Sequence, residues 1–254
     1  MPEHAASRDL HLTLRRQRLI QDAGGHNVWE RYSAEKTIAA DRVALILCDM
    51  WDAHWSRGAS ERVEAMAPRM NAAVHAARER GVWIIHAPSD TMAFYAGHPA
   101  RERILAVPEV EPPPERTDVI DYPLPVDASD HGSDTNESQV SRPWTRQHPA
   151  IDIDADRDVI ADDGARIYSY LQHRAVEQVL IMGVHTNMCI LNRSFAIKQM
   201  VRWGVDIALV RDLTDAMYNP ARLPYVDHWA GTGLVVAYIE KFWCPTISSE
   251  QLFG

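Results

Sequence analysis

The stretch VLIMGVHTNMC, residues 179–189, decides the fold. Its first six residues form a short apolar run, which is typical of a β-strand buried on both faces. Residues 185–187 then supply polar types that cap helices, and the sequence from Met188 to about Trp203 predicts a helix that ends at Gly204. The pattern therefore puts Cys189 in the first turn of a helix that follows a buried strand.

A cysteine in that position faces free backbone N–H groups and the positive end of the helix dipole. Both favour the thiolate, which is the nucleophilic form of the side chain. A lone cysteine is also often an inert core residue, so position and capping alone leave both interpretations of Cys189 open.

Strands and helices alternate on both sides of this stretch. Short apolar runs predict strands, and longer patterns between capping residues predict helices. The predicted strands are 43–48, 82–86, 151–153, 179–182 and 205–210, with 234–238 as a last strand or the start of a helix; the predicted helices are 60–80 or 68–80, 164–174 and 188–203. Such repeated units predict an α/β three-layer sandwich with a mostly parallel central sheet and helices on both faces.

The chain divides into an extension and one domain. Residues 1–40 are an N-terminal extension, for which Leu10–Leu14 and Val28–Tyr32 around Gly24-Gly25 predict a hairpin. Residues 41–254 form the α/β domain. A loop-rich insert near 87–150 interrupts it, and a stretch of that length without regular structure is usually functional, so we expect it to cover a site.

Composition limits the partners and the compartment. The formal net charge of −9 argues against nucleic acid and anionic membrane surfaces as partners. The partner that we expect is a small-molecule substrate. Three cysteines far apart in sequence (Cys48, Cys189 and Cys244) do not form a disulfide framework, which favours a reducing compartment. No stretch has the length of a transmembrane helix and the N-terminus lacks an apolar signal core, so we expect a cytoplasmic protein.

A second candidate catalytic group is Asp49. It follows the predicted strand 43–48 directly, and ligands of parallel α/β sheets bind beyond the carboxyl ends of the strands. A carboxylate there can take a proton from a thiol or give one to a leaving amine. An aspartate that anchors a loop is the alternative.

Two segments resemble the isochorismatase-like cysteine hydrolase family. ALILCDMWDAHW (44–55) is similar to the motif in which the first strand of that family ends in Asp-Met-Gln. Residues 179–216 are similar to its nucleophile motif, with Gly-x-x-Thr-x-x-Cys between a strand and a helix. The resemblance spans roughly residues 42–240.

The resemblance implies a Rossmann-like fold with a six-stranded parallel sheet, an amidase or related hydrolase activity, and no required cofactor. It implies that Cys189 attacks a carbonyl group to form a thioester and that Asp49 is the acid and base. The backbone N–H groups of Cys189 and of His185, the latter after a cis Val184–His185 bond, would hold the oxyanion. A homo-oligomer is also expected on this resemblance alone.

The third catalytic residue of that family, a lysine, has no counterpart here. The chain has only Lys36, Lys198 and Lys241, and Lys198 is too far along the predicted helix to reach Cys189. Alignment puts the lysine position close to Arg157, which can supply positive charge but cannot shuttle a proton. A catalytically degenerate protein that only binds a small molecule is therefore one alternative function.

The segment after Asp49 suggests another alternative, a metal-dependent hydrolase. Asp52 and His54, with His86 at the end of the next predicted strand, have the oxygen and nitrogen types that bind a divalent metal such as zinc. Polar residues that line a cleft are the competing interpretation. We further expect an apolar wall of the substrate site made of aromatic side chains, namely Trp51, Trp55, Phe94, Tyr95 and Trp144.

Overall fold

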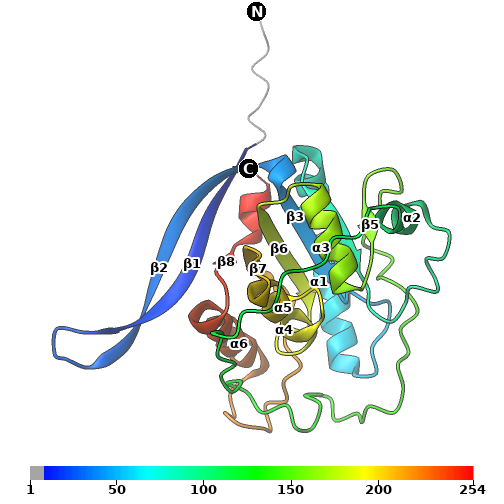
Figure 1. Ribbon diagram of the computed structural model, residues 1–254. Helices are drawn as coiled ribbons and strands as arrows, with labels where there is room; N and C mark the ends of the chain where they lie inside the picture. Colours follow the sequence, from blue (N-terminus) through cyan, green and yellow to red (C-terminus); the bar gives the residue numbers. More distant parts are fainter. Residues whose placement is uncertain (1–8, 254) are drawn as a thin grey trace, which may run out of the picture.

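The computed structural model describes residues 9–253, and its centre is one eight-stranded sheet (Figure 1). The strand order is β2-β1-β8-β7-β6-β3-β4-β5. The strands are β1 (Asp9–Gln21), β2 (Asn27–Ala39), β3 (Val43–Cys48), β4 (Trp83–Ala87), β5 (Val159–Ile160), β6 (Gln178–Val184), β7 (Ile207–Asp215) and β8 (Thr246–Ile247). The six strands from β8 to β5 are parallel to one another.

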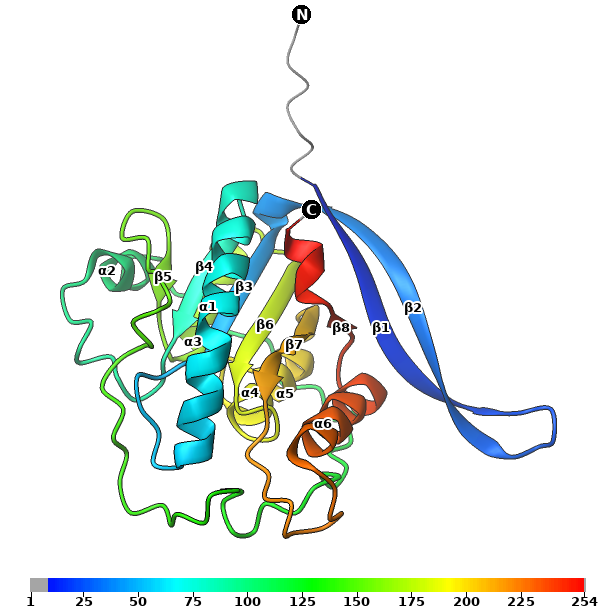
Figure 2. The same ribbon diagram turned by 180° about the vertical axis from the view of Figure 1, so that it is seen from behind.

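Helices cover both faces of the sheet (Figures 1 and 2). They are α1 (Arg57–Arg80), α2 (Pro99–Leu105), α3 (Gly164–His173), α4 (Cys189–Asn192), α5 (Ile197–Arg202) and α6 (His228–Phe242), with 3₁₀ turns η1 (Ala40–Arg42) and η2 (Ser249–Leu252). Alternate residues of β3 belong to different cores: Leu45 packs with α1 on one face, whereas Ile46 packs with α3, α5 and α6 on the other. The predicted three-layer arrangement is therefore correct.

The expected count of six strands is wrong for the whole sheet. Six parallel strands are present, but the N-terminal hairpin adds two more, because β1 pairs antiparallel with β8 through Arg15 and Thr246. The hairpin itself is longer than predicted, since all 13 residues of β1 pair with β2. The sheet is consequently mixed, with an antiparallel ribbon at one edge.

Several predicted boundaries also move. Residues 151–153 form no strand; the short edge strand is β5 at Val159–Ile160 instead. Helix α1 begins at Arg57, because the Ser56 side chain caps it by accepting a hydrogen bond from the N–H of Ala59. The helix then continues through Pro68. Residues 234–238 belong to α6.

The insert near 87–150 contains one short helix, α2, and otherwise irregular chain that runs past the ends of the strands (Figure 1). Trp51 forms an isolated β-bridge with Gln147, which ties the end of the insert to the chain after β3. Across residues 9–253, none of the helices is both long and apolar enough to span a membrane.

Candidate active site

The candidate site lies where β3 and β6 end side by side. These parallel strands pair up to Cys48 and Gly183. Gly183 has a φ of +121°, and a Cβ on it would lie 2.0 Å from the carbonyl oxygen of Cys48. Only glycine permits this close approach of two backbones, which brings the segments after the two strands together. Asp49 is the first residue after β3, and Cys189 is the first residue of α4.

The Asp49 carboxylate is fully buried and uses both oxygens. Oδ1 accepts a hydrogen bond from the backbone N–H of Ser89 at 2.8 Å, and Oδ2 accepts one from Nε of Arg193 at 2.8 Å. The thiol of Cys189 is a further hydrogen-bond partner. Burial raises the pKa of Asp49, while the Arg193 guanidinium and these hydrogen bonds act to lower it. The structure thus brings the predicted acid and the predicted nucleophile together.

The environment of Cys189 differs from the sequence expectation. Burial, and then the negative charge of Asp49, raise the pKa of the thiol well above its usual range, and the opposing effects of Arg193 and of the His185 backbone N–H do not reverse this. The predicted helix is also broken: α4 ends at Asn192 and α5 begins at Ile197. A single turn lacks the aligned peptide dipoles of a long helix, so it does little to stabilise a thiolate. The resting side chain of Cys189 is therefore a thiol, and it lies next to the Asp49 carboxylate.

Arg193 is the cation of the site, and sequence reasoning missed it. Its guanidinium also lies 3.5 Å from the Asp90 carboxylate and 5.8 Å from the centre of the Trp51 ring. Although burial opposes the charged form, Asp49 raises the pKa of Arg193 further, so the guanidinium stays protonated. The i, i+4 spacing from Cys189 was the one signal in the sequence, since residues four apart share one face of a helix, but the structure ends that helix before Arg193.

Arg157, the expected substitute for the lysine, lies elsewhere. It precedes β5, and its guanidinium donates to the carbonyl oxygen of Arg78 in the last turn of α1. That contact holds Arg157 at the opposite end of the strands from Asp49. The expectation was wrong because it assigned the cation by aligning the helix near 167–171 with that of the family, whereas the structure supplies it from the segment after α4.

The backbone N–H groups of His185 and Cys189 are the two expected oxyanion donors. The Val184–His185 peptide bond is cis, as expected. The His185 N–H hydrogen-bonds the Cys189 sulfur, and within residues 9–253 the N–H of Cys189 donates to no protein acceptor. Backbone N–H donors beside a nucleophile are the kind of group that an oxyanion hole uses.

A cavity of about 160 Å³ opens beside the thiol. Three of the five aromatic residues expected in its wall do line it, namely Trp51, Trp55 and Trp144, and the rings of Trp51 and Trp144 stack at 4.3 Å. The other two lie outside it. Phe94 is exposed and lies under Arg146, and Tyr95 is buried with its hydroxyl oxygen accepting from the N–H of Gln147.

The remaining lining residues share a polar or sulfur-containing side chain; four come from the insert, and Met188 and Arg193 flank α4. They are His54, Asp90, His131, Gln139, Arg142, His185, Met188, Arg193 and Met217. No spacing in the sequence links the insert residues to Cys189.

The imidazole rings of His54 and His185 lie 4.9 Å apart, and burial lowers the pKa of His54 to about 4 and that of His185 to about 3. Both imidazoles are therefore neutral near pH 7.

The structure does not gather the three proposed metal ligands. The Asp52 carboxylate accepts hydrogen bonds from Thr145, and His86 lies between Gln147 at 2.8 Å and Asp158 at 3.0 Å. His54 instead accepts from the N–H of Ser56. In the part of the chain that the structure describes, His, Cys, Asp and Glu side chains form no group of three that could hold a metal. Each of the three side chains is engaged in a hydrogen bond within the protein, so the described residues do not support the metal-site hypothesis.

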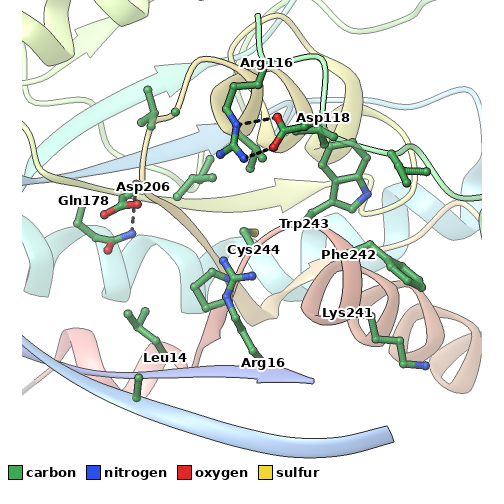
Figure 3. Close-up of a pocket in the computed structure, with 18 of the residues that line it drawn as sticks. Leu14, Arg16, Arg116, Asp118, Gln178, Asp206, Lys241, Phe242, Trp243 and Cys244 are labelled. Carbon is green, nitrogen blue, oxygen red and sulfur yellow. Dashed lines mark hydrogen bonds and ion pairs between the residues drawn. The ribbon is translucent and has the colours of Figure 1, made fainter. Parts of the chain in front are cut away.

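A larger hollow, of about 860 Å³, shares no lining residue with the cavity beside Cys189 (Figure 3). It separates the hairpin from the start of β7 and the end of α6, and its charged groups include the paired Arg116 and Asp118. Cys244 lies in its wall, but burial raises the pKa of that thiol to about 12. The smaller cavity beside Cys189 is therefore the candidate active site.

Comparison with known proteins shows that this chain is similar in fold to solved structures. No protein-family model matches the chain, and no curated protein matches it. Among solved structures, a cysteine hydrolase from Pseudomonas syringae pv. phaseolicola 1448A superposes with a TM-score of 0.51 at 16% identity, over 85% of this chain and 92% of that one. A putative isochorismatase from Burkholderia xenovorans LB400 gives 0.49 at 15% identity, over 84% and 86%. The chain thus has the fold of the Pseudomonas syringae cysteine hydrolase, as its sequence motifs implied.

Proposed function

We propose that this protein hydrolyses a C–N bond of a small amide through a cysteine nucleophile. The observation that carries the proposal is the contact of the Cys189 thiol with a buried carboxylate, Asp49, which a guanidinium holds in place. The fold likeness to a cysteine hydrolase supports it. The resemblance of the two sequence motifs to the isochorismatase-like family supports it independently.

In the first half of the reaction, Asp49 accepts the thiol proton as the sulfur of Cys189 attacks the substrate carbonyl carbon. The N–H groups of Cys189 and His185 stabilise the oxyanion. Asp49 then gives its proton to the leaving nitrogen as the C–N bond breaks, which leaves a thioester and a free amine. Burial raises the pKa of both groups, so the proton passes from the thiol to Asp49 together with the attack of the sulfur, and no free thiolate forms beforehand.

In the second half, Asp49 takes a proton from water, the water oxygen attacks the thioester, and the C–S bond breaks. The carboxylic acid leaves and the thiol regains a proton. Arg193 remains protonated throughout, since a guanidinium does not act as a base in proteins. Its role is to keep Asp49 ionised and oriented, and no step requires a cofactor or metal.

The substrate pocket favours a small, planar molecule. Its volume of about 160 Å³ leaves room for few heavy atoms, and the stacked Trp51 and Trp144 rings form a flat wall. Neutral His54 and His185 supply hydrogen-bonding groups without charge.

The test is ammonia or amine release from a panel of small amides. We expect the Cys189→Ala variant to lose turnover of every amide that the wild-type protein hydrolyses, whereas Cys244→Ala, a buried thiol outside the site, retains it. Acid quenching of the wild-type reaction should trap an acyl group on the peptide that contains Cys189. Full turnover by the alanine variant would refute the covalent route. Binding of amides without release of amine would instead support the non-catalytic alternative.

A further inference from the structure

Strand β2 is an unusually long and open sheet edge. Among the described strands, β1 is its only hydrogen-bonded neighbour. It has 13 residues, while typical strands have about five or six, and it contains no proline. Most of its side chains are exposed, Val28, Trp29 and Tyr32 among them. Both views show the hairpin standing out from the body (Figures 1 and 2). A strand edge of this kind is a template for pairing with another chain.

The charged residues of β2, NVWERYSAEKTIA, are placed so that two antiparallel copies of the strand bring opposite charges face to face. When two copies run antiparallel about Ser33, Glu30 faces Lys36 and Arg31 faces Glu35. Val28 then faces Ile38, and Trp29 faces Thr37. We propose that β2 pairs antiparallel with β2 of a second copy of this chain, about a two-fold axis at Ser33, and so joins the two sheets into one.

The register follows from the charges. Each dimer would contain four pairs of opposite charge, because each of the two pairings occurs twice by symmetry. Opposite charges directly across a strand pair stabilise it, and like charges destabilise it. If the axis moves to Tyr32 or to Ala34, no acidic residue faces a basic one. An axis on Ser33 also pairs odd-numbered residues with odd-numbered ones and even with even. An antiparallel ladder requires this, because alternate residues direct their backbone N–H and C=O groups to opposite edges of the strand.

The body holds the hairpin in a fixed orientation. The buried Glu240 carboxylate accepts from Nε of Arg15 at 2.6 Å and from Nε2 of Gln17 at 2.7 Å. The Trp29 ring packs edge-on against Phe242 of α6, with centroids 5.7 Å apart. Arg16 of β1 and Phe242 of α6 both line the hollow of Figure 3. A strand edge that is already ordered loses little conformational entropy when it pairs.

Cysteine cross-linking tests the register. At the axis, the two copies of residue 33 face each other, and Cα atoms directly opposite in an antiparallel pair lie about 4.5–5.5 Å apart, within disulfide range. We expect Ser33→Cys, in a chain that also carries Cys189→Ser, to form a disulfide-linked dimer under mild oxidation.

The matched control is Arg31→Cys in the same background. Residue 31 is exposed as well, but its two copies would be four positions out of register, about 13 Å apart along the strands. It should form at least tenfold less disulfide dimer in the same time. Equal yields from the two variants would indicate random collision and overturn the proposal.

Charge reversal tests the contact without new cysteines. Arg31→Glu places carboxylates opposite each other, and Glu35→Arg places guanidiniums opposite each other. Within the hairpin, residues 31 and 35 face the uncharged Gln17 and Thr13, so each reversal leaves the monomer's own pairs free of repulsion. We expect each single variant to raise the dimer dissociation constant about tenfold or more, and the double variant Arg31→Glu/Glu35→Arg to restore it.

Sedimentation over a range of protein concentrations measures these constants, and amide turnover per chain should stay the same, because β2 does not line the Cys189 cavity. A wild-type protein that is monomeric at every concentration overturns the proposal. A dimer that is insensitive to the single reversals, or one that the double variant fails to restore, overturns it as well.

Discussion

Replacing Asp49 with asparagine should change the reactivity of Cys189 and the turnover in opposite directions. Asp49 raises the pKa of the neighbouring thiol both by its charge and by its hydrogen bond. Asp49→Asn removes the charge, so the thiolate becomes more accessible while the proton acceptor is lost. The backbone tolerates the change, because Asp49 has a φ of 50° and asparagine is one of the few residues that adopts the left-handed region readily.

The magnitude follows from the contact. Two unit charges about 4 Å apart interact by roughly 4 kcal/mol at the effective dielectric constant of a protein, which corresponds to about three powers of ten in the population of thiolate. A less basic thiolate is also a weaker nucleophile, and that offsets about half of the gain on a logarithmic scale. Alkylation of Cys189 should therefore be up to about thirtyfold faster in the variant, while turnover falls by at least about a hundredfold.

The assay is the rate of iodoacetamide labelling of Cys189 near neutral pH, followed by peptide mass spectrometry, beside amine release by the same preparations. Cys48 and Cys244 are buried and serve as internal controls for loss of structure. If the variant loses turnover and its Cys189 labels no faster than in the wild-type protein, Asp49 does not act directly on the thiol. If it retains turnover, Asp49 is not the acid and base.

Three further predictions concern the surroundings of this pair. Arg193→Gln should slow labelling of Cys189, because the guanidinium lowers the pKa of that thiol, and Arg193→Lys should restore part of the rate; a faster rate in the glutamine variant would contradict the assigned role. Burial lowers the pKa of His185 to about 3, below its ordinary value, so the unfolded chain binds the proton more readily between pH 6.5 and 3 and folding stability falls as the pH drops through that window. The loss attributable to His185 is about 2 kcal/mol between pH 6.5 and 5, and thermal unfolding of His185→Leu over this range should show a correspondingly weaker pH dependence. Prolonged treatment with a chelator should leave amide turnover unchanged, since Asp52 and His86 are already engaged by Thr145 and by Gln147 and Asp158; loss of turnover that zinc restores would show that a metal takes part.

Much of the site was predictable because it depends on where strands end. The apolar runs of β3 and β6 are short and buried on both faces, and parallel strands of one sheet end at a common edge. Asp49 and the segment before Cys189 follow these two strands directly, so the sequence alone indicated that they share a cleft.

The cation was not predictable in the same way. Helix α4 stops at Asn192 although neither glycine nor proline follows it. The carbonyl oxygen of Ser194 packs so closely on Gly164, at the start of α3, that a Cβ there would lie 2.0 Å from it, and the Ser194 hydroxyl accepts from the N–H of the same glycine. A contact between segments thirty residues apart thus breaks the helix after one turn.

By itself, the sequence indicated the α/β layering, the parallel orientation of the central strands and the shared edge of Asp49 and Cys189, because hydrophobic periodicity fixes which faces are buried and strand ends fix what lies at the edge. The tertiary structure alone decided that Arg193 is the cation, that the insert completes the cavity wall, and that the thiol is protonated at rest. Those properties depend on distances and desolvation between segments remote in sequence, and no local pattern of residues encodes either.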